Sequence, residues 1–282
     1  MLNNKIDFVA IISVKNANPN GDPLNGNRPR EDINGFGEIS DVCLKRKIRN
    51  RWIDMGEDVF VQSNEKNVDG FKSLSDRAAD SLGTIKDHDE YAKKASEKWI
   101  DVRGFGQVFA FKKRRGVTDE VSVGVRGPIS IHPAFSVDTI DVEDLQITKS
   151  VNSEPTDKIK SSDTMGMKHR IDFGVYVTKG SINCQLAEKT GFTEEDVEKF
   201  HQALIELFEN DASASRPEGS MVMEKVYWFK HNCKNGQYPS VKVHESVSLT
   251  KNSDVVNASS IKDYEIKVEP LDGLDVEEYS LR

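Results

Sequence analysis

The sequence predicts an α+β fold in which helices cover one face of a ferredoxin-like sheet, an architecture that RNA-recognition domains share. Three observations predict it. Residues 8–14 form a continuous apolar run, residues 193–208 have the apolar spacing of a helix, and several other segments alternate apolar and polar residues. In chain order the expected elements are strand, helix, strands, helix and strand. We expect a single domain over residues 1–282, with its core in residues about 5–56, 103–135 and 171–250.

The first expected strand is the apolar run of residues 8–14, whose composition predicts burial on both faces. A loop rich in Asn, Pro and Gly, residues 16–30, ends it. A helix is expected over residues 38–54, because Gly56 supplies a stop signal just beyond it. Residues about 57–102 are polar and mixed, with helical stretches near their middle and end, and we expect an insertion there rather than core.

The middle of the chain predicts further strands. Residues 121–131 alternate like a strand pair that is broken at Gly127-Pro128. Residues 149–170 are polar and predict a loop. Residues 171–186 alternate again, and Gly180-Ser181 predicts a hairpin turn within them.

The clearest helix covers residues 193–208. Thr193 can cap it, and Asp196 can reach back as Glu does in a capping box. Its apolar face is expected from Val197, Phe200, Leu204 and Leu207 or Phe208. Extended segments are expected after it at residues 221–229, 238–249 and 264–268.

The charge of the chain is strongly segregated. A net charge of -8, taken alone, argues against a nucleic-acid partner. However, residues 190–211 hold seven acids and one lysine, whereas residues 103–126 hold six bases and two acids. Such segregation permits a basic groove on an acidic body.

Several classes of site are not expected. The three cysteines form no CxxC pair, so neither a disulfide framework nor a zinc site is implied. The chain has no P-loop, HExxH or GxSxG motif, and we expect no cofactor. It has neither an apolar signal core nor an apolar run long enough for a membrane span, which predicts a cytoplasmic protein without a membrane partner.

The first expected helix carries an unbroken basic block from Lys45 to Arg51. At helical spacing Lys45, Arg46 and Arg49 share one sector, whereas Lys47 and Arg51 point elsewhere. A solvated charged face and a grip on phosphates are the two interpretations. We favour the grip, because the block lacks the i,i+4 acids of a solvated face and follows a stiff loop rich in backbone donors.

Three other segments are candidates for binding. Residues 165–170 place two methionines beside Lys-His-Arg, so they either contact bases and phosphates or bury one methionine. The cluster Lys112–Arg115 is either an exposed turn or a binding patch. Arg216, in a loop of small residues, either contacts phosphate or caps the preceding helix.

These segments together resemble a known family. Asn18-Pro-Asn-Gly-Asp-Pro23 followed by residues 37–51 closely resembles the backbone subunit of the type I-C CRISPR Cascade surveillance complex, in the RAMP superfamily. Further similar segments are Arg126-Gly-Pro128, Ile147–Asn152, Thr164–His169 and Phe208–Arg216. The resemblance covers nearly the whole chain.

The resemblance implies an RRM-like palm with finger-like insertions and a thumb, formed either by residues 149–170 or by a hairpin at residues 121–131. It implies copies that stack along one CRISPR RNA, whose guide reads target DNA by base pairing. Other Cascade subunits and a recruited helicase-nuclease would be further partners. The RNA-binding residues expected on this basis are Asn18, Asn20, Arg30, Lys45, Arg46, Arg49, Arg126, Met165, Met167, Lys168, His169, Arg170 and Arg216.

The RAMP superfamily also contains enzymes that process guides, so a metal-independent endoribonuclease is the alternative. Such cleavage needs a general base and a general acid within reach of the 2′-hydroxyl. His169, Lys168 and Tyr176 are the candidates, but no pair of them forms a distinctive motif. We therefore expect a scaffold rather than an enzyme.

Overall fold

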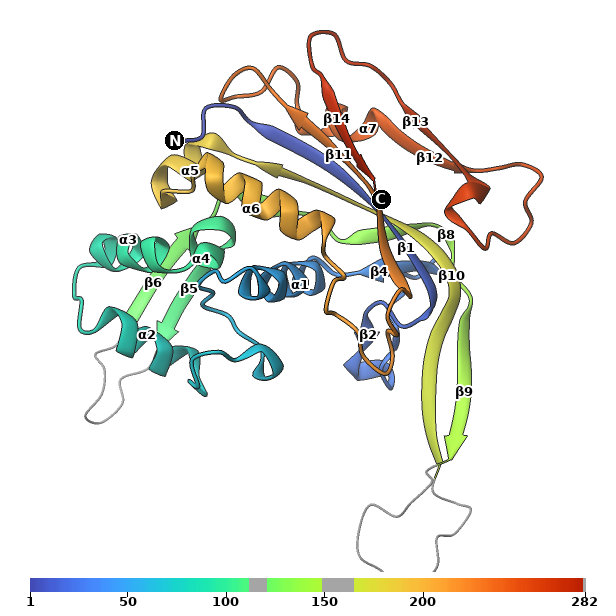
Figure 1. Ribbon diagram of the computed structural model, residues 1–282, viewed down its shortest axis with the longest axis horizontal. Helices are drawn as coiled ribbons and strands as arrows, with labels where there is room; N and C mark the ends of the chain where they lie inside the picture. Colours follow the sequence, from blue (N-terminus) through green and yellow to red (C-terminus); the bar gives the residue numbers. More distant parts are fainter. Residues whose placement is uncertain (112–120, 149–164, 281–282) are drawn as a thin grey trace, which may run out of the picture.

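The computed structural model describes residues 1–111, 121–148 and 165–280 of the chain (Figure 1). Within them the protein has a mixed α+β fold built on an eight-stranded antiparallel sheet. Across the sheet the strands are β14 (Val276–Ser280), β11 (Met221–Lys230), β1 (Ile6–Ala17), β10 (Met165–Ile182), β8 (Ala134–Thr139) and β4 (Phe36–Ile39). β7 (Ile129–Ile131) and β9 (Val142–Thr148) pair with other parts of β10.

The strand expected at residues 8–14 is confirmed as the centre of the sheet. β1 pairs with β10 on one side and β11 on the other, and it is buried on both faces. Because successive side chains of a strand point to opposite faces, β1 serves two cores. Phe8 and Ile12 join the larger core, and Val9 and Ile11 join the smaller one.

The larger core lies beneath a layer of three helices, α1 (Asp41–Asp54), α5 (Cys184–Thr190) and α6 (Glu194–Ile205) (Figure 1). The capping box of α6 is confirmed: Thr193 Oγ1 accepts from Asp196 N at 3.2 Å, and Asp196 Oδ2 accepts from Thr193 N at 2.9 Å. The expected start of α1 at residue 38 is wrong. Glu38 lies in β4, and Ser40 caps the helix instead.

The smaller core lies on the opposite face of the sheet, under the hairpin of β12 (Val247–Lys251) and β13 (Tyr264–Val268). The expected strand at residues 264–268 is confirmed. The extended segment expected at residues 238–249 is wrong in part, because residues 240–245 form helix α7 (Ser240–Glu245). Val243 of α7 is buried in this core, so helices lie on both faces of the sheet.

Three expectations about the middle of the chain are corrected. Residues 121–131 are two strands, but they do not pair: β6 (Val121–Arg126) pairs with β5 (Gly106–Phe111), and β7 pairs with β10. Gly180 is no hairpin turn, because β10 runs straight through it. Residues 165–170 are no loop, because their backbone pairs with β9 along the first part of β10.

A third apolar cluster lies apart from the sheet. It is built by α2 (Leu74–Leu82), α3 (His88–Lys98), α4 (Ile100–Phe105) and the β5–β6 hairpin, with Phe60, Trp99 and Phe109 at its centre (Figure 1). The helices expected within residues 57–102 are therefore present, and that segment shares a core with β5 and β6. The small elements of the remaining chain are β2 (Gly21–Asp22), β3 (Arg28–Pro29) and the 3-10 turns Pro23–Asn25, Asn64–Lys66 and Ile261–Asp263.

In the described part of the chain, no helix combines the length and the apolar character that crossing a membrane requires.

Candidate nucleic-acid interface

The start of α1 is fixed by the loop of residues 18–30. Asn20 Oδ1 accepts hydrogen bonds from Ser40 N at 3.0 Å and from Ser40 Oγ at 2.9 Å. Ser40 Oγ in turn accepts from Cys43 N at 3.2 Å, as the N-cap of α1. The amide oxygen of Asn20 thus holds the helix cap in place.

The same loop is closed by Asn18, which is 2% exposed. Asn18 Nδ2 donates to Asn27 O at 2.7 Å, and its backbone N–H donates to Ser215 O at 2.9 Å. Through Asn18 the loop of residues 211–219 docks on the first loop. The loop of residues 18–30, the start of α1 and the distant loop of residues 211–219 therefore meet.

Two of the predicted arginines sit at this junction with unused hydrogen-bonding capacity. The Nε atoms of Arg30 and Arg216 are buried and have no hydrogen-bond partner in the described chain. Their ion pairs are long, at 3.7 Å from Arg30 to Asp22 and 3.7 Å from Arg216 to Asp211. Buried donors without partners are costly, so both guanidinium groups favour an additional acceptor.

Arg46 is the third cation of the junction. It is half-buried and forms no ion pair with a described carboxylate within 4.0 Å. Burial and the neighbouring Arg49 both lower the pKa of Arg46. Backbone hydrogen bonds hold the other two arginines beside the same turns: Arg30 N donates to Asn20 O at 3.0 Å, and Ser215 O, next to Arg216, accepts from Asn18 N at 2.9 Å. The structure thus places Arg46 on α1 and the other two arginines in the loops that dock at the start of this helix.

The other four basic residues of α1 each have an acidic partner. The pairs are Lys45–Asp41 at 3.0 Å, Lys47–Asp211, Arg49–Asp101 at 2.8 Å and Arg51–Glu206, whose Nε–Oε2 hydrogen bond is 2.9 Å long. The expectation that this block lacks compensating acids is therefore wrong. Asp41 is an i,i+4 partner within the helix, and the other three acids arrive from distant segments.

A long two-stranded arm carries the predicted methionines. β9 and the first part of β10 project from the sheet beyond the loop of residues 18–30 (Figure 1). Met165 and Met167 lie on one face of this arm, and each is 55% exposed. Lys168 and Arg170 lie on the other face, where Arg170 Nε bonds to Glu143 at 2.7 Å. The arm therefore offers apolar side chains on one face and cations on the other.

Asp144 connects the arm to the loop. His169 Nδ1 lies 2.6 Å from Asp144 Oδ1, and Arg28 pairs with the other oxygen of the same carboxylate. Arg28 first, and then His169, lower the pKa of Asp144. This link holds the base of the arm beside the loop of residues 18–30.

The residues of the alternative endoribonuclease site are not brought together. Tyr176 is fully buried, and burial raises the pKa of its hydroxyl strongly. Seven residues of extended strand separate it from His169, which corresponds to about 23 Å, and the two side chains point to opposite faces. His169 is held by Asp144 instead.

Arg126 stands apart from the other predicted residues. It is exposed at the end of β6 and lines a separate hollow with Lys5, Lys189 and Lys234. The cluster Lys112–Arg115 and residues 149–164 of the expected loop lie outside the described residues.

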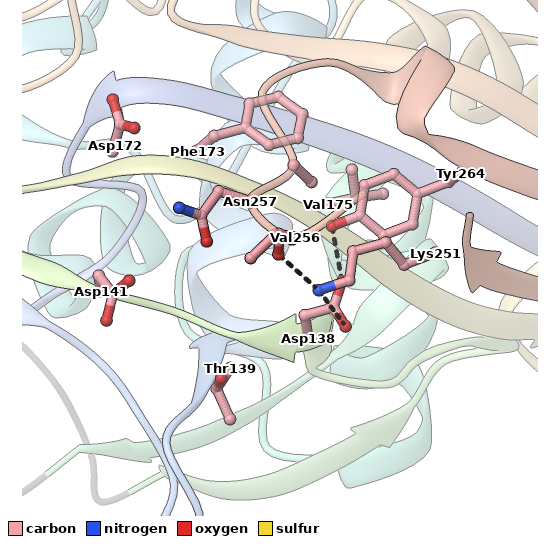
Figure 2. A pocket seen from close by; sticks show the side chains of 12 residues that line it. Asp138, Thr139, Asp141, Asp172, Phe173, Val175, Lys251, Val256, Asn257 and Tyr264 are labelled. Carbon is pink, nitrogen blue, oxygen red and sulfur yellow. Dashed lines mark hydrogen bonds and ion pairs between the residues drawn. The ribbon is translucent and has the colours of Figure 1, made fainter. Parts of the chain in front are cut away.

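An acidic pocket lies on the face of the sheet that carries β12 and β13. Figure 2 shows Asp138, Asp141 and Asp172 in its wall, with Lys251 as the lining cation. Tyr264 Oη donates to Asp138 Oδ2 at 2.8 Å, and Lys251 lies 3.7 Å from Asp138. Three carboxylates against one ammonium repel phosphate, so a polyanion is not expected here.

Sequence reasoning missed the acids that position the cations, above all Asp101, Asp144 and Asp211. They lie 52, 116 and 164 residues from Arg49, Arg28 and Lys47 respectively. No local pattern connects such pairs. Among the described residues, no three His, Cys, Asp or Glu side chains gather closely enough to hold a metal ion.

Comparisons with known proteins agree with one another. The family model of CRISPR-associated protein Cas7 matches residues 4–269. The CRISPR-associated protein Cas7 of Haloferax volcanii is 25% identical over 225 residues, which cover 75% of this chain and 66% of that protein. The chain thus spans just under two thirds of that relative's length. A chain of a solved CRISPR RNA-guided surveillance complex, pre-nicking, has a TM-score of 0.52 at 18% identity, covering 80% of this chain and 78% of that one. At this identity the likeness concerns the fold alone.

Proposed function

The chain belongs to the family of CRISPR-associated protein Cas7, and on that premise we propose that it is a non-catalytic scaffold that binds CRISPR RNA within a Cascade surveillance complex of type I-C. The observation that carries the proposal is the meeting of Arg46 on α1 with the two loops that hold Arg30 and Arg216 and dock at the start of this helix.

These arginines suit a phosphate backbone. Guanidinium groups bind phosphate oxygens through directed pairs of N–H groups, and such contacts position a strand without reading its sequence. Arg30 and Arg216 keep unused Nε donors, and Arg46 has no carboxylate partner in the described chain. A strand crossing the start of α1 would contact the guanidinium groups of Arg30 and Arg216, whose side chains are 35% and 28% exposed, together with that of Arg46.

We assign the parts of a hand-shaped architecture accordingly. Taken in chain order, β1, β8, β10 and β11 lie side by side in the order 4-1-3-2, which supports an RRM-like palm. The third apolar cluster, formed by α2, α3, α4 and the β5–β6 hairpin, serves as the finger-like insertion. The arm of β9 and β10 serves as the thumb, with Met165 and Met167 facing the bases.

The proposed assembly rests on the family to which the chain belongs. Further copies of the chain stack along one guide, and the guide reads target DNA by base pairing. Other Cascade subunits complete the complex, and a helicase-nuclease is recruited to it. In this arrangement the protein supplies backbone contacts, and the RNA supplies sequence specificity.

Guide binding by a variant that lacks three positive charges tests the proposed phosphate contacts. We compare Arg30→Gln, Arg46→Gln, Arg216→Gln with a control of equal charge change, Lys93→Gln, Lys94→Gln, Lys267→Gln, at exposed positions. For a single strand, losing three phosphate contacts lowers the slope of log K against log salt by about 2. An unchanged slope in the arginine variant, or an equal loss in the control, contradicts the proposal.

Assembly is tested separately. Native mass spectrometry with guides of increasing length is expected to show copies added in equal steps. A single copy at every length would instead favour a module that acts alone.

Incubation with repeat RNA without metal tests the enzymatic alternative: discrete cleavage that His169→Ala abolishes would overturn the scaffold proposal.

A further inference from the structure

A second basic hollow lies where β1 begins, away from the junction at the first turns of α1. Its lining residues are Lys5, Arg126, Asn183, Gln185, Leu186, Lys189, Lys234 and Asn235, which include four cations, three amides and no carboxylate. Lys5 directly precedes β1, and Asn18 directly follows it. The ten residues of β1 before the left-handed Asn16 span about 33 Å at the usual rise of a strand, so the hollow is distinct from the surface that Asn18 organises.

Two of the four cations are uncompensated. Lys5 lies 3.0 Å from Asp7 and donates to Ser240 Oγ at 2.7 Å, and Lys234 pairs with Glu188. Arg126 and Lys189 are exposed and have no ion pair in the described chain. A concave surface with two free positive charges concentrates anions from solution.

The amide groups of the hollow are oriented as donors. Asn183 Oδ1 is occupied, because it caps α5 by accepting from Leu186 N at 2.8 Å. Asn235 Oδ1 is occupied as well, by Gln185 Nε2 at 2.5 Å. The amide nitrogens of Asn183 and Asn235 remain available to donate. A ligand that only accepts hydrogen bonds and carries negative charge fits this set of groups.

We propose that this hollow binds the backbone phosphates of a nucleic-acid strand other than the one held at α1. The phosphates of a strand present a continuous row of charged acceptors, which suits a hollow that combines two free cations with amide donors. Because the contacts are to phosphate, both RNA and DNA qualify, and the experiment distinguishes them.

The test uses the full chain saturated with guide RNA, so that the first surface is occupied. Labelled single-stranded RNA, single-stranded DNA and duplex DNA, none complementary to the guide, are titrated over a range of salt. For Arg126→Gln, Lys189→Gln we expect the slope of log K against log salt to fall by about 1.4 with a single strand and by about 1.8 with a duplex. The probe that the wild-type chain binds most tightly, and whose affinity this variant loses, identifies the strand.

A second variant separates binding from folding. Asn183→Asp keeps the oxygen that caps α5 but replaces the amide donor with a negative charge, so it is expected to weaken binding and leave helix content unchanged. For Arg126→Gln, Lys189→Gln the control of equal charge change is Lys93→Gln, Lys94→Gln on α3, which is expected to bind with wild-type affinity.

Unchanged affinity and slope for all three probes would overturn the inference, as would an equal loss in the control. Binding of a labelled polyglutamate peptide, with no binding of any nucleic-acid probe, would assign the hollow to an acidic protein instead. Failure of the proposed function is a separate result, since it shows as absent guide binding by the wild-type chain.

Discussion

Arg49 Nε donates to Asp101 Oδ2 at 2.8 Å, and Asp101 Oδ1 accepts from the backbone N–H of Phe60 at 2.7 Å. Arg49 is 12% exposed and Asp101 is 1% exposed. One carboxylate therefore ties α1 to the segment that forms the third apolar cluster. The guanidinium also lies over the Phe105 ring, 5.1 Å from its centroid. Arg49 is thus committed to the fold, although it shares a helix sector with Arg46.

The first prediction separates these two arginines. Arg49→Gln leaves Asp101 buried without its charge partner, and we expect the free energy of unfolding to fall by about 3 kcal/mol. Arg46→Gln breaks no ion pair in the described chain and is expected to cost less than about 1 kcal/mol, while it lowers the salt slope of guide binding by about 0.7. Urea unfolding and RNA titration of the folded proteins measure the two effects.

The reverse pattern, with stability lost in Arg46→Gln and guide affinity lost in Arg49→Gln, would contradict the assignment. If the assignment holds, a double variant, Lys45→Ala, Arg49→Ala, is expected to bind guide RNA more weakly chiefly because a smaller fraction of it is folded. Correcting affinity for the folded fraction checks this explanation.

The second prediction concerns Gly180, near the end of β10. A Cβ placed there would lie 2.2 Å from Phe8 Cζ and 2.4 Å from Ser130 O, and the backbone oxygen cannot move aside cheaply. Gly180→Ala is expected to lower the free energy of unfolding by about 1–3 kcal/mol. Gly124→Ala in β6 is the matched control, because no described atom lies within 4 Å of its new Cβ. Equal melting temperatures for the two variants would contradict the close approach.

The sequence pattern predicted those helices and strands that are determined by their own residues rather than by distant contacts. The apolar run at residues 8–14 and the capping box of Thr193 and Asp196 needed no distant information, and both were confirmed. Gly180 misled, because a glycine required for the close approach of Phe8 has the same local pattern as a glycine in a turn. Residues 165–170 misled because they form a strand that is paired on an exposed arm, where no buried face imposes alternation.

The candidate site was less predictable than the fold, since its charges are balanced over long distances in sequence. The basic block on α1 is visible in the sequence, but whether each cation is free depends on acids such as Asp101 and Asp211. Arg46 and Arg49 lie in the same helical sector and differ only in that respect. A single sequence carries no signal for such pairings.

The third prediction concerns pH. Burial lowers the pKa of His201 to about 4, and its ring lies between Trp228 and Tyr279, with centroids 4.4 Å and 4.2 Å away. In the unfolded chain the imidazole of His201 has its ordinary pKa near 6.5. The contribution of the buried neutral ring to the free energy of unfolding is therefore complete above that pH and is lost as pH falls from about 6.5 to about 4. The slope is about 1.4 kcal/mol per pH unit.

Burial also lowers the pKa of His244, which titrates in the same direction. His201→Phe is therefore expected to remove part of the pH dependence of the free energy of unfolding in this window, and His201→Phe, His244→Phe more of it. The carboxylates with lowered pKa, such as Asp196, lose their contribution only below about pH 4 and do not interfere. An unaltered pH profile in both variants would contradict a buried neutral His201.

The last prediction distinguishes apolar contacts on the arm from the arginine grip. Met165 and Met167 are each 55% exposed, so Met165→Ala, Met167→Ala is expected to change the melting temperature little. If both side chains contact bases, guide affinity falls at every salt concentration, while the salt slope stays at its wild-type value because no charge is lost. Val256→Ala, at a position 84% exposed on the opposite face of the sheet, is the apolar control and is expected to bind normally. A changed slope would show that the arm acts through its cations, and unchanged affinity would remove the methionines from the interface.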